Sequence, residues 1–335
     1  MDTMRHRGAS EPAVVAIGGG TGLSTMLRGL KRYTRNLTAI VTVADDGGGS
    51  GVLRSELNMP PPGDIRNCIQ ALANTEPTMG DLLNYRFTQG SLKGQSFGNL
   101  FLAALNGMSE SFDQAVMKMS EVLAITGRVL PVSNENIRLL AEFDDGTEVI
   151  GESLIAHHKA RHDRTIVRIR LIPEHPAALP DSLRAIEEAD LIILGPGSLY
   201  TSIIPNLLTE GVAQAVCASD AVKLYIMNVM TQDGETEGYT AAGHIRALQK
   251  HAGRELFHLC LANSMPLPAE ILSRYRRWGA EPTILDEAEI ERLGVHLITA
   301  PVADVRNGYV RHQPQMLARE IMRIYREQSP TRIYR

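Results

Sequence analysis

The stretch Ala13-Val-Val-Ala-Ile-Gly-Gly-Gly-Thr-Gly22 opens the first structured part of the chain. An apolar run that passes directly into glycines is typical of a buried parallel strand that ends in a tight loop. A helical apolar pattern follows over residues 23–30, and a second apolar run covers residues 37–43. This order of strand, glycine loop, helix and strand predicts a βαβ unit whose loops lie at the carboxyl ends of the strands.

The pattern changes twice farther along the chain. Residues 63–127 are mostly helical, whereas residues 128–175 carry alternating apolar positions around a hairpin turn at Asp145-Gly146, which indicates a β-rich insertion. Strand and helix patterns then alternate again from residue 189 to a last helix that begins near Pro314. Three more apolar runs predict buried strands, at residues 222–229, 256–261 and 296–299.

These patterns predict one α/β domain over residues 13–330, a Rossmann-like three-layer α/β/α fold with a mostly parallel sheet. Residues 1–12 are polar, so we expect a disordered tail without the apolar segment of a secretory signal. The cysteines are odd in number and widely spaced, at Cys68, Cys217 and Cys260. This spacing argues against a disulfide framework and favours a cytoplasmic protein.

The composition argues against two kinds of partner. The net charge is -4 and aromatic residues make up 5% of the chain, so neither charge nor stacking favours nucleic acid. No apolar run approaches the roughly 18 residues that a membrane-spanning helix needs. We therefore expect no nucleic-acid partner and no integral membrane segment.

The first glycine loop is a candidate phosphate-binding site. Glycines between a strand and a helix let backbone N–H groups approach a phosphate, and the helix N-terminus adds about half a positive charge. The spacing matches neither the G-x-G-x-x-G dinucleotide fingerprint nor a Walker A loop, so a turn without a ligand is the alternative. The candidate ligand-binding residues here are Gly19, Gly20, Thr21, Gly22 and Leu23.

Two acidic residues, Asp45 and Asp46, follow the second predicted strand and precede three glycines. In a dinucleotide fold an acidic residue at this position accepts hydrogen bonds from ribose hydroxyls. Adjacent carboxylates can also hold Mg²⁺ beside a diphosphate. Capping of the following loop is the alternative, and we favour a role in ligand binding.

Two helix starts carry further candidates. Asp64 is suited to an N-cap, and Arg66 and Asn67 follow it in the first turn, where they could contact a phosphate. Asn99 lies in a helix start made of small residues, which permits close approach to an anion. The alternatives are an exposed arginine at the first helix and simple packing at the second.

A third glycine cluster follows the predicted strand at residues 189–194. Its candidate ligand-binding residues are Gly197, Ser198 and Leu199, and Asn228 closes the strand beside it. Because the carboxyl ends of parallel strands meet at one edge of the sheet, we expect these loops to converge on one crevice.

The histidines His157, His158 and His162 form a local cluster. Metal ligation is one interpretation. The segment is basic and polar, however, and we predict a solvated loop there.

Several motifs together resemble the YvcK-like family of gluconeogenesis factors. The resemblance runs from about Pro12 to the C-terminal pair Arg311-His312, with one departure at Gly49, where the family has Ser. The motifs that carry it are Ile17–Ser24, Val41–Gly51, Pro61–Asn67, Gly98–Leu100 and Gly195–Leu199.

The resemblance implies a cytoplasmic protein with a Rossmann-like core that binds UDP-sugars such as UDP-N-acetylglucosamine. Such proteins support cell shape and envelope synthesis during growth on gluconeogenic carbon sources. The resemblance also implies that Tyr275 and Arg311 bind the ligand. On this interpretation the chain is a binding protein rather than an enzyme, it requires no cofactor, and a homodimer is the expected assembly.

The same family is similar to the CofD-like 2-phospho-lactate transferases, which use Mg²⁺. Asp45, Asp46 and Asp64 would then be the catalytic counterparts, with Asp45 and Asp64 at the metal. Ile65-Arg66-Asn67 stands where those enzymes carry further acidic residues, and this favours an anion over a metal. A third hypothesis, an NAD(P)-linked oxidoreductase, lacks both the fingerprint and an evident acid or base for hydride transfer.

Overall fold

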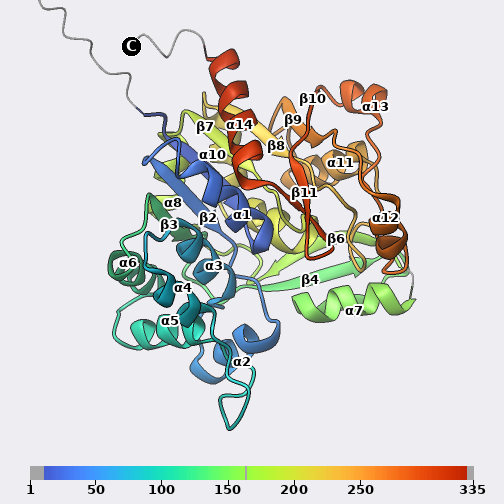
Figure 1. Cartoon of the computed structure of the whole chain (residues 1–335). Coiled ribbons are helices and arrows are strands. Elements are labelled where there is room, and N and C mark those ends of the chain that lie inside the picture. The colour runs from blue at the N-terminus through green and yellow to red at the C-terminus, as the bar shows by residue number, and fades with distance from the viewer. Residues whose placement is uncertain (1–10, 163, 330–335) are drawn as a thin grey trace, which may run out of the picture.

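The computed structural model describes residues 11–162 and 164–329 (Figure 1). The predicted disordered tail falls mostly on residues 1–10, which lie outside the described residues. A seven-stranded sheet forms the centre, in the order β10-β9-β8-β7-β1-β2-β3, and every neighbouring pair is parallel. Its strands are β1 (Val14–Gly18), β2 (Leu37–Val41), β3 (Arg128–Pro131), β7 (Leu191–Leu194), β8 (Val222–Ile226), β9 (Leu259–Asn263) and β10 (His296–Ala300).

Helices surround this sheet and make the fold a three-layer α/β/α arrangement, which confirms the predicted class (Figure 1). A π-helix, η1 (Leu199–Ile203), leads into α9. The helices outside the insertion are α1 (Gly20–Leu30), α2 (Gly48–Leu57), α3 (Gly63–Leu72), α4 (Pro77–Asn84), α5 (Phe97–Gly107), α6 (Phe112–Val122), α8 (Pro180–Glu187), α9 (Ile204–Leu208), α10 (Val212–Ala218), α11 (Ala241–Ala252), α12 (Ala269–Arg276), α13 (Glu287–Arg292) and α14 (Pro314–Gln328).

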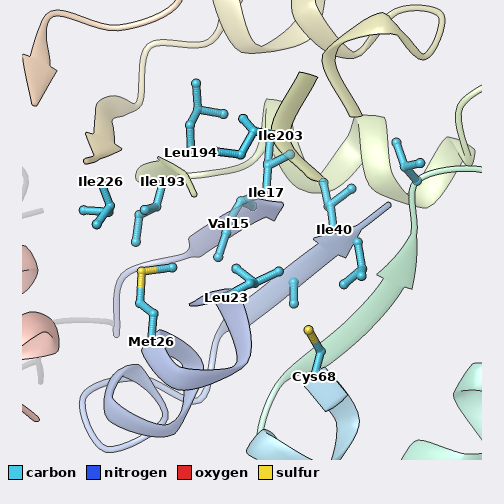
Figure 2. Packing of buried hydrophobic residues seen from close by; sticks show 14 of the residues in the cluster. Val15, Ile17, Leu23, Met26, Ile40, Cys68, Ile193, Leu194, Ile203 and Ile226 are labelled. Atoms are coloured by element: carbon cyan, nitrogen blue, oxygen red, sulfur yellow. The ribbon is translucent and has the colours of Figure 1, made fainter. Parts of the chain in front are cut away.

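The central strands are apolar without alternation because both faces are covered. Every residue of β1, β2 and β7 is buried. Figure 2 shows Leu23 and Met26 of α1 packed on one side of β1 and Ile203 of the π-helix on the other. Burial on both faces explains why these strands appear in the sequence as continuous hydrophobic runs.

The strand order reverses at β1. The chain runs outward from β1 through β2 to β3, and in the opposite direction from β7 to β10. In open α/β sheets, ligands bind outside the carboxyl ends of the strands at such a switch point. The glycine loops after β1 and β7 therefore border the position that the topology favours for a ligand.

The predicted β-rich insertion is smaller than expected and contains a helix. Its three strands, β4 (Arg138–Phe143), β5 (Glu148–Ile150) and β6 (Ile166–Ile172), form a separate antiparallel sheet in the order β5-β4-β6. β3 belongs to the central sheet instead, where it pairs with β2.

The histidine-rich segment was predicted as a loop, and that prediction was wrong. It forms α7 (Glu152–His162), which lies beside β4 (Figure 1). Ile155 is fully buried, but its neighbour Leu154 is exposed, so the helical apolar pattern is weak. Its first turn is held by Asp46, whose Oδ1 accepts a hydrogen bond from the Ser153 N–H at 2.9 Å. The residue that stabilises the start of this helix, Asp46, is thus far away from it in the sequence.

A β-hairpin of β11 (Ala303–Arg306) and β12 (Tyr309–His312) leads into α14. α14 packs against α1, and the two helices lie side by side in Figure 1. Their approach requires Gly29, because a Cβ there would lie 2.0 Å from the carbonyl oxygen of Pro314. The C-terminal elements therefore rest directly on the helix that follows the first glycine loop.

Candidate functional site

The loops after β1 and β7 touch each other through their backbones. A Cβ at Gly22 would lie 2.7 Å from the carbonyl oxygen of Pro196, and one at Gly197 would lie 3.1 Å from the carbonyl oxygen of Gly19. Gly20 has φ of +68°, in the left-handed region that favours glycine. The glycines are thus needed for the close contact of two loops at the switch point.

A cavity of about 480 Å³ opens beside these loops. Its size is in the range of small-molecule sites, which is about 300–1,000 Å³. Two sides come from the predicted glycine loops, and the rest comes from the segment after β8, from α12 with the residues that follow it, and from the C-terminal hairpin. The predicted ligand-binding residues that line it are Gly20, Thr21, Gly22, Gly197, Ser198, Asn228, Tyr275 and Arg311.

Two of these residues hold the loops together. The Asn228 side chain donates to the Gly197 carbonyl oxygen at 2.8 Å and accepts from the Gly197 N–H at 3.3 Å. The Ser198 hydroxyl donates to Gln232 Oε1 at 2.7 Å. Asn228 thus fixes the backbone of the third glycine cluster, and Gln232 connects that cluster to the loop after β8.

Trp278, Tyr309 and Arg311 line one part of the cavity and are called here the arginine–aromatic rim; the Arg274 guanidinium lies over the Trp278 and Tyr309 rings. The Trp278 and Tyr309 rings stack with centroids 5.9 Å apart and planes at 21°. The guanidinium carbon of Arg274 lies 5.2 Å from the Trp278 centroid, and that of Arg311 lies 5.3 Å from the Tyr309 centroid. This rim combines positive charge with flat apolar surface, the two features that suit an anionic ligand with a ring.

Tyr275 contributes its ring to the cavity, and its hydroxyl is engaged elsewhere. The hydroxyl oxygen accepts a hydrogen bond from the Val310 N–H at 2.8 Å. Tyr275 also packs edge-on against Trp278, with centroids 5.5 Å apart. It therefore holds β12, and with it Arg311, in place beside the cavity.

Four carboxylates gather on the other side of the first glycine loop: Asp45, Asp64, Glu152 and Glu235. Asp64 accepts a hydrogen bond from the Gly20 N–H, while burial and the nearby Asp45 raise its pKa to about 6. Burial, followed by repulsion from Asp45 and Asp64, also raises the pKa of Glu152. These carboxylates therefore make an electronegative region next to a loop suited to phosphate.

Glu235 lies beneath the third glycine cluster. Its carboxylate accepts hydrogen bonds from the Thr201 hydroxyl at 2.7 Å and from the Tyr200 N–H at 3.2 Å. Burial raises its pKa to about 7, although these hydrogen bonds act in the opposite direction. Within residues 11–162 and 164–329, no group of three or more His, Cys, Asp or Glu side chains is arranged to hold a metal ion.

The remaining predicted residues lie outside the cavity lining. Asp46 anchors α7, as described above, and Asp45 accepts from the Gly47 N–H at 2.8 Å. Arg66 donates to Asn99 Oδ1 at 3.3 Å and connects α3 to α5, and Asn67 is half-buried on α3. The side chains of two further predicted residues belong to the hydrophobic core: Leu23 and Leu199.

Several residues that the fold brings to the site were not predicted from the sequence. Trp278 and Tyr309 belong to the rim, and Glu152 and Glu235 belong to the carboxylates. Trp278 is the single tryptophan of the chain, and its exposed fraction is 44%. A lone tryptophan beside an arginine run was the one available signal, whereas the carboxylates are placed by tertiary contacts alone.

Comparison with known proteins assigns this architecture to a family. The profile of the family described as 2-phospho-L-lactate transferase CofD matches residues 14–303. The chain belongs to the CofD family. A gluconeogenesis-factor relative from Thermoanaerobacterium thermosulfurigenes is 55% identical over 93% of this chain and 96% of its own length. The gluconeogenesis factor of Bacillus subtilis is 46% identical over 95% of this chain and 99% of its own.

A solved structure agrees with the fold of this CofD-family chain. The crystal structure of a protein from Bacillus halodurans superposes with a TM-score of 0.91 at 44% identity, and covers 93% of this chain and 100% of that one. The sequence resemblance to the gluconeogenesis factors is thereby confirmed. Across the described part of the chain, no helix has the length and apolar character needed to cross a membrane.

Proposed function

We propose that this CofD-family chain is a cytoplasmic regulatory protein that binds a UDP-sugar such as UDP-N-acetylglucosamine. Through this binding it would support cell shape and envelope synthesis during growth on gluconeogenic carbon sources. The observation that carries the proposal is the pairing of two features across one cavity. Glycine loops suited to a diphosphate border one side, and the arginine–aromatic rim lines another.

The geometry suggests a role for each part. Backbone N–H groups at the start of α1 and in the third glycine cluster would receive the diphosphate, since both lie at the switch point. Arg311 would neutralise phosphate charge, and the exposed part of Trp278 would offer a stacking surface for the base, since the Tyr309 ring already packs against Trp278 and Arg311. Asp46 is committed to α7, and Asp45 lies outside the cavity lining, so Asp45 would accept hydrogen bonds from ribose or sugar hydroxyls only if the ligand extends past the first glycine loop.

Calorimetric titration with UDP-N-acetylglucosamine tests this function, with NAD⁺ and GTP as competing controls and with Mg²⁺ present or absent. We expect micromolar affinity, about -8 kcal/mol, selective for the UDP-sugar and indifferent to Mg²⁺. Arg311→Ala should weaken binding, whereas Arg277→Ala, an exposed arginine outside the cavity, should not. Equal affinity in both variants, or no binding by the wild type, would contradict the proposal. We also propose a homodimer, which sedimentation of the same sample would test.

A second candidate is a Mg²⁺-dependent transferase that acts on a nucleotide diphosphate. The carboxylates favour it, because Asp45 and Asp64 repel each other beside the first glycine loop and a cation there would relieve that repulsion. Mg²⁺ usually takes only one or two carboxylates and completes its shell with water and phosphates, so these residues fit. When bound, the ion would neutralise charge on the phosphates.

The transferase hypothesis has its own measurement. A product released from a labelled nucleotide diphosphate only with Mg²⁺, and lost in Asp45→Asn, would support it. Binding without Mg²⁺ dependence and without any product across acceptors would exclude it.

A further inference from the structure

Asp233 brings a second charge to the cavity. It belongs to the loop after β8, it is exposed, and it lines the cavity. Among the described residues of the lining, those that carry a charge at pH 7 are Arg311 and Asp233, because burial lowers the pKa of His312 to about 4. The cavity thus offers a donor that suits an anion and, in Asp233, an acceptor that an anion would avoid.

The loop holds Asp233 between two parts of the site. On one side, Oε1 of its neighbour Gln232 accepts a hydrogen bond from the Ser198 hydroxyl at 2.7 Å, which connects the loop to the third glycine cluster. On the other side, a Cβ at Gly279 would lie 2.8 Å from Asp233 Oδ1. Gly279 follows Trp278 directly in the chain and has φ of +70°. The carboxylate therefore lies against the backbone next to the tryptophan.

Contacts on both sides of Asp233 restrict the movement of this loop. The Thr231 N–H donates to the Glu281 carbonyl oxygen at 2.7 Å, and the Glu281 N–H donates to the Thr231 hydroxyl at 2.9 Å. Farther along the loop, Glu237 forms an ion pair with the buried Lys159 of α7 at 2.6 Å. The position of Asp233 is therefore set before a ligand binds, which lowers the entropy lost on binding.

A nucleotide placed as proposed above has its ribose between these two parts of the site. The phosphates would lie at the glycine loops and the base on Trp278, and the ribose connects the phosphates to the base. The ribose hydroxyls can donate hydrogen bonds, whereas phosphate oxygens at neutral pH only accept them. Partial burial and, after it, the neighbouring Glu237 raise the pKa of Asp233. A donor on the ligand would stabilise the charged carboxylate in these surroundings.

We propose that the Asp233 carboxylate accepts hydrogen bonds from the 2′- and 3′-hydroxyls of the ribose. Asp233 is then a specificity-determining residue: it selects ribonucleotides over deoxyribonucleotides, and its charge disfavours a ribose that carries a further phosphate. The inference rests on the proposed nucleotide-sugar binding. It gives the ribose an acceptor that lines the cavity, which Asp45 does not.

Calorimetry with UDP and with 2′,3′-dideoxy-UDP, which lacks both hydroxyls, tests the contact. We expect the wild type to bind the dideoxy analogue about tenfold more weakly than UDP, because hydrogen bonds to a charged group are lost. Asp233→Ala should bind UDP about tenfold more weakly than the wild type does. It should also bind both ligands equally, since neither hydroxyl then has its acceptor. Asp233→Asn retains one acceptor oxygen and should retain part of the preference for UDP.

Two controls accompany these variants. Asp81→Asn, at an exposed aspartate of α4 outside the cavity, should bind both ligands as the wild type does. N3-methyl-UDP lacks the imide N–H of the base and should show the same loss with Asp233→Ala as UDP does. A loss that disappears with N3-methyl-UDP would assign the contact to the base and overturn the inference. Thermal unfolding of each variant controls for misfolding.

The remaining outcomes separate this inference from the proposed function. Tighter binding of UDP by both Asp233 variants would mean that the carboxylate only repels the phosphates. An unchanged preference of Asp233→Ala for UDP over the dideoxy analogue would show that the hydroxyls do not contact it. A loss confined to UDP-N-acetylglucosamine would place the contact on the sugar. Each of these results would overturn the inference and leave nucleotide binding intact, whereas absence of UDP binding by the wild type would overturn both.

Discussion

Glu235 makes the stability of this protein depend on pH in a direction opposite to that of most carboxylates. Its side chain is almost fully buried and accepts hydrogen bonds from the Thr201 hydroxyl and the Tyr200 N–H. Burial is the largest influence and raises its pKa from 4.5 to about 7. The substitution Glu235→Gln removes the ionisation and keeps only one acceptor oxygen. The Thr201 hydroxyl and the Tyr200 N–H donate to different carboxylate oxygens, so the exchange also adds a cost that does not depend on pH.

The sign follows from proton binding. Between pH 4.5 and 7, the folded protein keeps a proton on Glu235 that the unfolded chain releases, so the free energy of unfolding falls as pH rises through this window. The difference between the two pKa values corresponds to about 3 kcal/mol in the free energy of unfolding. The folded protein has lost this stability once the pH is above 7. Glu235→Gln should therefore be less dependent on pH, and it should gain stability relative to the wild type as pH rises.

Urea denaturation followed by circular dichroism at several values between pH 5 and 8 measures this effect. Glu281→Gln, at an exposed glutamate, is the matched control and should follow the wild type. Asp64 adds a dependence of the same sign that cancels in the difference between wild type and variant. Glu152 does not cancel fully, because the charge of Glu235 contributes to the raised pKa of Glu152. If the wild type and Glu235→Gln differed by a constant amount at every pH, the buried carboxylate would not be the source.

Three further substitutions test the contacts around the cavity. Gly22→Ala places a Cβ 2.7 Å from the Pro196 carbonyl oxygen. It should lower the free energy of unfolding by about 1–3 kcal/mol and weaken UDP-N-acetylglucosamine binding in calorimetry. Unchanged affinity would disprove close contact of the loops. Asp46→Ala should cost about 1 kcal/mol and speed amide hydrogen exchange in α7; exchange as slow as in the wild type would show that the cap is dispensable. Tyr275→Phe leaves the Val310 N–H without its acceptor and should cost about 1–3 kcal/mol in urea denaturation; no loss would mean that the hairpin is held by other contacts.

The first βαβ unit could be predicted because its signals are local. A continuous apolar strand, glycines at its end and a helical apolar stripe all occur within about thirty residues of Ala13. The same kind of local signal correctly predicted the loop at Gly197 and the strand before Asn228. Contact between the first and third glycine loops followed from the rule that parallel strands share one carboxyl edge, whereas the loop after β2 does not line the cavity.

The features that could not be predicted depend on contacts between distant segments. The short apolar pattern of β3 fits a strand of the central sheet and a strand of an antiparallel sheet equally well. Only its pairing with β2 shows that it belongs to the central sheet. α7 is held by Asp46, 107 residues away from Ser153. The pKa of Glu235 depends on its burial beneath the π-helix, for which a single sequence carries no signal.

The contact between the two glycine loops also fixes when the site can exist during synthesis. Asn206 donates to the carbonyl oxygen of Gly18, across 188 residues of chain. The first loop leaves the ribosome early, but it can form this contact only after the second loop has been synthesised. The part of the rim on β12 is synthesised later still. Such long sequence separations slow folding, because each closure loses chain entropy before any contact forms. A nascent or C-terminally truncated chain therefore lacks the cavity, so ligand binding would report that translation has reached the end of the domain.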